Sequence, residues 1–178
     1  MNKSIKGILI IVLLFIIIYF LQINFFSWFN ISGVMPNLFV ILVLFIGLFV
    51  GNKLGGVFGL AIGIILDITF GRTVGVTGVL LAIIGLIGEY FDKNFSKDNR
   101  MMIILVSIAC TILFEVGMYI FKFATLKIDI DIPAFAITLL IENLFNSLLI
   151  IIFYTGIKKI GYYLEDTFKG RKLLTRYF

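Results

Sequence analysis

Long apolar runs, separated by short polar or glycine-containing breaks, constrain this chain more than any other feature of its sequence. A helix that crosses a bilayer needs about 20 apolar residues at a rise of about 1.5 Å per residue. Residues 7–28, 101–121 and 133–157 reach that length. Charged residues make up 14% of the chain, whereas a soluble domain has about 25%. Too little polar surface is available to cover a globule in water, so the sequence predicts an integral membrane protein.

Six apolar segments are predicted to form transmembrane helices, at residues 7–28, 37–50, 54–70, 76–91, 101–121 and 133–157. The second and third are short, and they suffice only if the turn at Gly51 to Lys53 lies at the membrane interface. A five-span arrangement, or a re-entrant pair formed by these two segments, stays open. The expected fold is an all-α, polytopic membrane helix bundle over residues 1–157, followed by a basic, aromatic tail over residues 158–178.

The basic residues predict the orientation, because Lys and Arg gather in cytoplasmic loops. With both termini in the cytoplasm, the outer side holds only Arg72, Lys122 and Lys127 of the 15 basic residues. The basic, aromatic tail then lies beside the membrane, where contact with anionic lipids is expected. This placement explains the net charge of +5 without a nucleic-acid partner.

A layer of polar residues is predicted inside the membrane. Asp67, Glu115 and Glu142 each lie roughly 21–22 Å from the cytoplasmic end of their own helix. The amides in or near the same layer are Gln22, Asn24 and Asn143. One hypothesis is that the three acids form a single cluster in an outward-facing cavity or at a site for a partner helix. The other is that the polar groups only make hydrogen bonds between helices; both interpretations stay open.

Small residues form a stripe on the third segment. Gly55, Gly59, Gly63 and Asp67 recur every four residues, and Gly71 continues the stripe, with Gly75 just beyond it. Such a stripe lets two helices approach closely, so it is predicted to be a helix-packing or partner interface. Two isoleucines of this segment, Ile62 and Ile65, are expected to lie off the stripe. The fourth segment carries a second stripe of Gly78, Ala82, Gly85 and Glu89.

No catalytic signature is found. The chain has no histidine, and its one cysteine, Cys110, lies within an apolar run. Histidine-based zinc sites and Ser-His-Asp triads are therefore excluded. The prediction is a protein that is not an enzyme, with no catalytic residues, cofactor or metal.

The chain resembles the MreD family of the bacterial rod-shape system over nearly its whole length. The resemblance is carried by Pro36-Asn37, then by Gly59-Leu60-x-x-Gly63-x-x-x-Asp67, and then by Gly71 and Gly75. Ile64 departs from the leucine that the family often has there. The resemblance implies a non-enzymatic scaffold of cell-wall elongation in the bacterial cytoplasmic membrane. Its implied partners are MreC and, through MreC, MreB, RodA and the elongation transpeptidase.

A second function stays as the alternative, because MreD-like proteins are similar in fold to the substrate-binding subunits of ECF vitamin transporters. Such a subunit binds a vitamin in an outward-facing pocket and docks through an Ala-x-x-x-Ala face on its first helix. The first segment here contains no alanine, which weighs against a transporter subunit.

Overall fold

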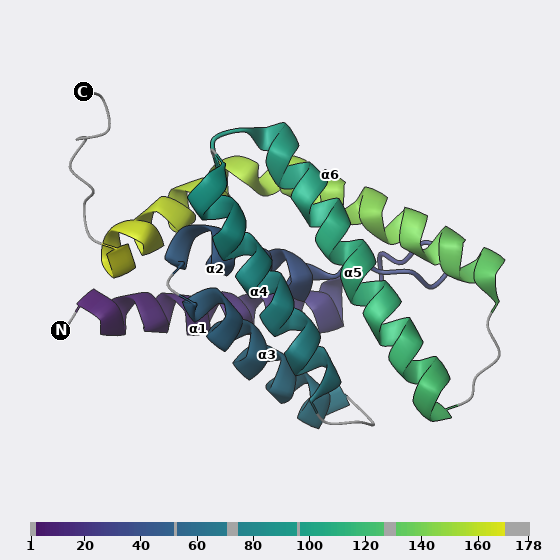
Figure 1. The fold of residues 1–178 in the computed structure, drawn as a ribbon. Coiled ribbons are helices and arrows are strands. Elements are labelled where there is room, and N and C mark those ends of the chain that lie inside the picture. Colours follow the sequence, from purple (N-terminus) through teal and green to yellow (C-terminus); the bar gives the residue numbers. More distant parts are fainter. Residues whose placement is uncertain (1–2, 52, 71–74, 96, 127–130, 170–178) are drawn as a thin grey trace.

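The computed structural model describes residues 3–51, 53–70, 75–95, 97–126 and 131–169, and these ranges are almost entirely helical. A short π-helical turn, η1 (Leu21–Phe25), continues the first helix (Figure 1). The α-helices are α1 (Lys3–Phe20), α2 (Leu38–Val50), α3 (Leu54–Phe70), α4 (Val76–Asn94), α5 (Arg100–Leu126) and α6 (Ile132–Lys169). This confirms the predicted all-α membrane helix bundle. Gly71 and Arg72 lie outside the described residues.

Helix α2 is the centre of the bundle. Every residue from Phe39 to Val50 is buried, and each of the other five α-helices packs against α2. A helix that is apolar on all sides is stable only where other helices or lipid cover it completely. The apolar second segment therefore forms the core rather than a lipid-facing wall.

Three helical stretches have the length and apolar character needed to cross a membrane, namely Ser4–Phe25, Arg100–Thr125 and Ile132–Lys169. Helices α2 and α3 are shorter, with 13 and 17 residues, so the five-span and re-entrant alternatives remain. Helix α6 has 38 residues and is therefore about 57 Å long. It continues through the predicted boundary at residue 157, and residues 158–169 of the predicted tail are helical.

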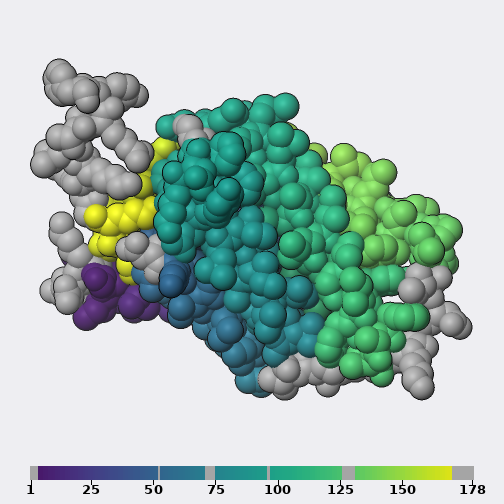
Figure 2. Space-filling view, viewed as in Figure 1, coloured from purple at the N-terminus to yellow at the C-terminus, as the bar shows by residue number. Residues whose placement is uncertain are grey.

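The two ends of the described chain lie at the same end of the bundle (Figures 1 and 2). The start of α1 touches the last turn of α6, because a Cβ atom on Gly7 would lie 2.4 Å from the Phe168 ring. The turn after α2 and the connection between α4 and α5 share this end, which we call the charged end because its ion pairs join Asp92 to Lys169. Within the described ranges each α-helix runs back along the bundle, so six of them return the chain to the end where it begins.

Candidate functional site

Helices α3 and α4 are in backbone contact along the predicted glycine stripe (Figure 1). A Cβ atom on Gly59 would lie 2.4 Å from the Leu81 carbonyl oxygen, and one on Gly63 would lie 2.4 Å from the Gly78 Cα atom. Real Cβ atoms essentially never come closer than 3.0 Å to another heavy atom. Any larger residue at either position would force the helices apart.

Helix α2 joins the same contact through Gly47, which neither predicted stripe contained; Gly88 of α4 was not predicted either. A Cβ atom on Gly47 would lie 2.3 Å from the Gly85 carbonyl oxygen, and one on Gly88 would lie 2.6 Å from the Leu44 carbonyl oxygen. Gly55 lies between them, since its Cβ atom would meet the Gly47 Cα atom at 2.6 Å. The resulting glycine seam holds three helices together, and its members are Gly47, Gly55, Gly59, Gly63, Gly78, Gly85 and Gly88.

The two isoleucines that were expected to lie off the stripe differ in how much of each side chain is exposed. Ile62 is only 4% exposed and belongs to the core, whereas Ile65 is 47% exposed. The expectation for Ile62 was therefore wrong. The buried face of α3 is broader than a stripe with a spacing of four residues, because residues three apart also share a helix face.

Asp67, at the end of the stripe, binds the start of α4. Its carboxylate, which is 3% exposed, accepts hydrogen bonds from the backbone N–H groups of Gly75 at 2.7 Å and Gly78 at 3.4 Å. The first N–H groups of a helix have no partner within the helix, and a negative charge there also favours the helix dipole. Gly75 has a φ of +105°, which explains glycine at this position.

Two of the predicted intramembrane acids lie together. The carboxyl groups of Glu115 on α5 and Glu142 on α6 interact with each other and with the side chain of Asn37, at the start of α2. The charge of Lys122, two turns further along α5, acts on Glu115. Among the contacts between described residues, the Asp67 carboxylate is joined to Gly75 and Gly78 and to neither glutamate. The structure thus divides the three acids into a pair and a separate helix cap.

Next to this acid pair, a buried chain of hydrogen bonds joins three helices. The Asn146 side chain accepts a hydrogen bond from the Asn37 backbone N–H at 2.9 Å and donates one to the Thr111 hydroxyl at 3.0 Å. Neither Asn146 nor Thr111 was among the predicted site residues. Their signal in the sequence is periodicity, because Asn146 follows Glu142 by one turn and Thr111 precedes Glu115 by one turn.

The predicted amides have separate, local roles. Gln22 donates to the Pro36 carbonyl oxygen at 2.8 Å and accepts from the Leu38 N–H at 3.1 Å, so it fixes η1 to the start of α2. Asn24 and Asn143 each donate to a carbonyl oxygen of their own helix, four residues earlier. Gln22 is thus bound beside Asn37, whereas Asn24 is exposed and its side chain bonds only within its own helix among the described contacts.

Three buried polar atoms in the described part of the chain have no hydrogen-bond partner: Ser107 Oγ, Glu142 Oε1 and Asn143 Oδ1. A buried polar group without a partner costs about 1–3 kcal/mol. Hydrogen-bonded groups and unused acceptors therefore coexist at the acid pair, where Glu142 and Asn143 lie, whereas Ser107 precedes Glu115 by about two turns of α5.

The charged end carries a second cluster, which the sequence did not indicate. The Lys97 ammonium lies 2.7 Å from an Asp92 carboxylate oxygen and 2.8 Å from a Glu165 oxygen, and Lys169 pairs with the same two acids. All four side chains are largely buried. Burial works to raise the pKa of Asp92, but the hydrogen bonds from Lys169 and Lys97 outweigh it and hold this pKa below its usual value.

A neighbouring group of side chains ties α6 to the connection between α4 and α5. Lys158 and the Tyr162 hydroxyl both bind the Asp98 carboxylate, and the Tyr154 hydroxyl donates to the Asp98 backbone carbonyl at 2.9 Å. The hydrogen bond from Lys158 holds the pKa of Asp98 below its usual value, and the Tyr162 bond adds to this. Two lysines of the predicted lipid-binding tail, Lys158 and Lys169, are thus paired within the protein.

A family model described as rod shape-determining protein MreD matches residues 2–160. The chain belongs to this family. MreD proteins take part in rod-shape determination and are membrane proteins. The chain is therefore a multi-pass protein of the cytoplasmic membrane, and its candidate spanning helices agree with this. MreD is a family of shape-determining structural membrane proteins and not a known enzyme family. Comparison with the curated proteins and with the solved structures gave no match.

Proposed function

We propose that this MreD protein is a non-enzymatic scaffold that couples MreC and MreB to the peptidoglycan synthases of the elongation complex. MreC is the direct partner in this proposal, and MreB, RodA and the elongation transpeptidase are reached through it. Family membership supports the proposal, because it implies a place in the rod-shape complex.

The observation that carries the proposal is a rigid centre surrounded by unpartnered apolar helix faces. The glycine seam fixes α2, α3 and α4 by backbone contact. Helix α1, in contrast, exposes large apolar side chains along its length, among them Leu9, Leu13 and Ile16. A single-span partner could pack along such a face by van der Waals contact, as membrane helices do. A fixed centre would hold several partners in a constant arrangement.

Isolation of the protein in mild detergent, followed by mass spectrometry of what remains bound, tests the proposal. We expect MreC and the wall synthases to be recovered. A Leu13→Asn, Ile16→Asn variant places two amides on the exposed face of α1 and should recover less MreC while its own yield is unchanged. If neither the parent nor the variant recovers MreC and the synthases, the scaffold proposal is contradicted.

One observation favours the alternative, a substrate-binding subunit of an ECF-type transporter. Glu142 Oε1 and Asn143 Oδ1 are buried acceptors without a partner, and a polar solute could use them. Recovery of an ATPase pair and a transmembrane transporter subunit in the same experiment would support this function and contradict the first.

A further inference from the structure

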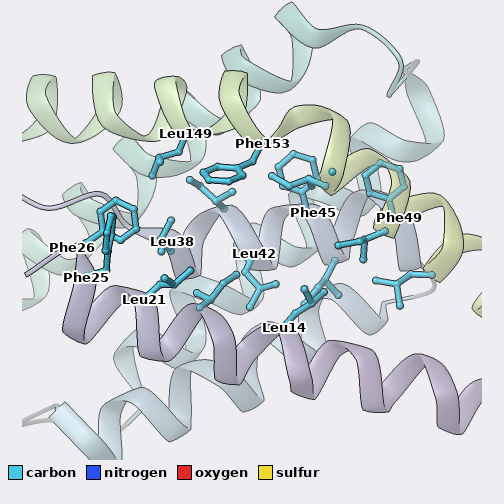
Figure 3. Close-up of a pocket in the computed structure, with 18 residues that line it drawn as sticks. Leu14, Leu21, Phe25, Phe26, Leu38, Leu42, Phe45, Phe49, Leu149 and Phe153 are labelled. Atoms are coloured by element: carbon cyan, nitrogen blue, oxygen red, sulfur yellow. The ribbon is translucent and has the colours of Figure 1, made fainter. Parts of the chain in front are cut away.

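A deep apolar groove runs between α1 and α6, with α2 as its floor (Figure 3). Leu14 and Ile18 of α1 form one wall, Phe153 and Ile157 of α6 form the other, and Leu42 and Phe45 lie at the bottom. All 18 lining residues are apolar. Water would find no hydrogen-bond partner there, and a cavity of that kind stays dry. In a membrane, hydrocarbon is therefore the natural content of this groove.

The size of the groove selects the kind of hydrocarbon. Along α6 it extends from Leu149 to Leu164, which is about 22 Å of helix. Its volume is about 460 Å³. At about 30 Å³ for a group of the size of water or a methylene, this space holds roughly fifteen such groups, comparable to one lipid acyl chain.

Charge at one end of the groove selects the headgroup. The groove reaches the charged end at Phe49, Gly161 and Leu164. Lys6 of α1 and Lys159 of α6 do not line the groove, but they are exposed on its two wall helices near the charged end. Neither lysine takes part in an ion pair within the part of the chain that the structure describes. One unpaired cation on each of the two wall helices complements a phosphate at the membrane surface.

We propose that this groove binds one acyl chain of an anionic phospholipid, whose headgroup lies at the charged end beside Lys6 and Lys159. The bound chain would complete the packing between α1 and α6, which the protein's own side chains leave open over this length. This lipid site goes beyond the scaffold function and does not depend on it.

Gly156 provides the test, because it lines the groove and an added Cβ atom would meet no heavy atom within 4 Å. A Gly156→Phe substitution therefore places a ring in the groove without a clash at its first carbon. Ile152→Phe is the matched control, since Ile152 is 61% exposed on the same helix and does not line the groove.

The experiment uses the full chain in nanodiscs of equal parts phosphatidylglycerol and phosphatidylcholine. The protein is transferred to detergent and washed, and the retained phospholipid is counted by mass spectrometry. We expect the parent and Ile152→Phe to retain about one phospholipid per chain, and Gly156→Phe to retain several-fold less. Circular dichroism and gel filtration establish that each variant is folded.

The headgroup is tested with a Lys6→Gln, Lys159→Gln variant, which should retain lipid but lose the preference for phosphatidylglycerol. An unchanged preference would overturn the headgroup assignment. Equal retention by the parent and a folded Gly156→Phe would overturn the acyl-chain site. Loss of MreC from Gly156→Phe at unchanged lipid retention would assign the groove to a partner helix instead. Because recovery of MreC is measured separately, failure of the lipid site is distinguishable from failure of the scaffold proposal.

Discussion

Three polar side chains in this bundle bind the starts of other helices. Asp67 binds the first N–H groups of α4, and Gln22 binds the Leu38 N–H at the start of α2. Asn146 binds the Asn37 N–H in the same region. Because a helix start has no internal partners for its N–H groups, a few side chains fix where short helices begin.

The cap made by Asp67 gives the first prediction. Asp67→Asn keeps a carbonyl oxygen that can accept the hydrogen bonds of Gly75 and Gly78, so we expect partial function. Asp67→Leu leaves both N–H groups unpaired in a buried site, which should cost about 1–3 kcal/mol and lower the yield of folded protein. Thermal unfolding in detergent and complementation of cell shape measure the two effects. Equal losses in both variants would mean that the charge, and not the cap, is required.

Paired cysteines test the division of the three acids. In a Cys110→Ala background, cysteines at positions 115 and 142 should cross-link with a short reagent, because the carboxyl groups of Glu115 and Glu142 interact. Cysteines at positions 67 and 115 should not, because the Asp67 carboxylate is bound to the start of α4. If the cysteines at positions 67 and 115 cross-link efficiently, the three acids form a single cluster, as their matching depths in the membrane suggested.

At the level of the helices, the α2–α3–α4 centre is held by backbone contact and the outer helices by side chains. Gly59→Leu or Gly63→Leu should separate α3 from α4 and abolish function, because an added Cβ atom alone meets backbone atoms at 2.4 Å. Ile65→Leu, on the exposed face of α3, is the control. Complementation of cell shape and the amount of protein in the membrane are the measurements. Normal function of either glycine variant would show that the seam tolerates separation.

The ion pairs at the charged end give a pH prediction. The lowered pKa of Asp92 means that its pairing with Lys97 and Lys169 stabilises the fold at pH values above the usual value of 3.8. That stability is lost as the pH falls through the pKa that Asp92 has in the folded protein, which is lower than its usual value. The parent should therefore melt at a higher temperature than Asp92→Asn between pH 8 and pH 5, by a constant margin, and the margin should shrink below about pH 4.

A control at the opposite end of the bundle accompanies this measurement. Asp131 lies there, and its side chain accepts a hydrogen bond from the Ala134 N–H at 3.1 Å. Asp131→Asn keeps that acceptor and removes a carboxylate that makes no ion pair among the described residues, so it is the control for the loss of one negative charge. If the parent still melts at a higher temperature than Asp92→Asn at low pH, by the same difference, the ion pairs do not stabilise the fold.

Much of the fold followed from the sequence, because lipid-crossing helices are marked by composition. The third predicted segment, residues 54–70, coincides with α3. The ion pairs did not follow, since Asp92 and Lys169 are 77 residues apart and no local pattern links them. Asn146 and Thr111 were missed for a related reason, because uncharged residues in an apolar helix give a weak signal until the neighbouring helix is known.

For the whole molecule, the prediction concerns orientation. Both ends of the described chain lie at the charged end, and the excess of Lys and Arg in the loops there favours the cytoplasm. A reporter fused after Phe178 should therefore be active in the cytoplasm and inactive in the periplasm. Fusions at Gly33 should show the reverse, and the same result at both positions would exclude an even number of spans.

The unequal lengths of the helices have a consequence for the surrounding bilayer. Helix α3 has 17 residues and exposes Val57, Leu60 and Ile68, yet it is only about 26 Å long, against about 30 Å for a typical hydrocarbon core. Helix α6, on another side of the bundle, is more than long enough. If α3 crosses the bilayer, the lipids beside it must compress or tilt to match it, at a cost of a fraction of a kcal/mol per ångström. In that arrangement the protein would favour membrane regions of reduced thickness and would distort a thicker bilayer unevenly around its perimeter.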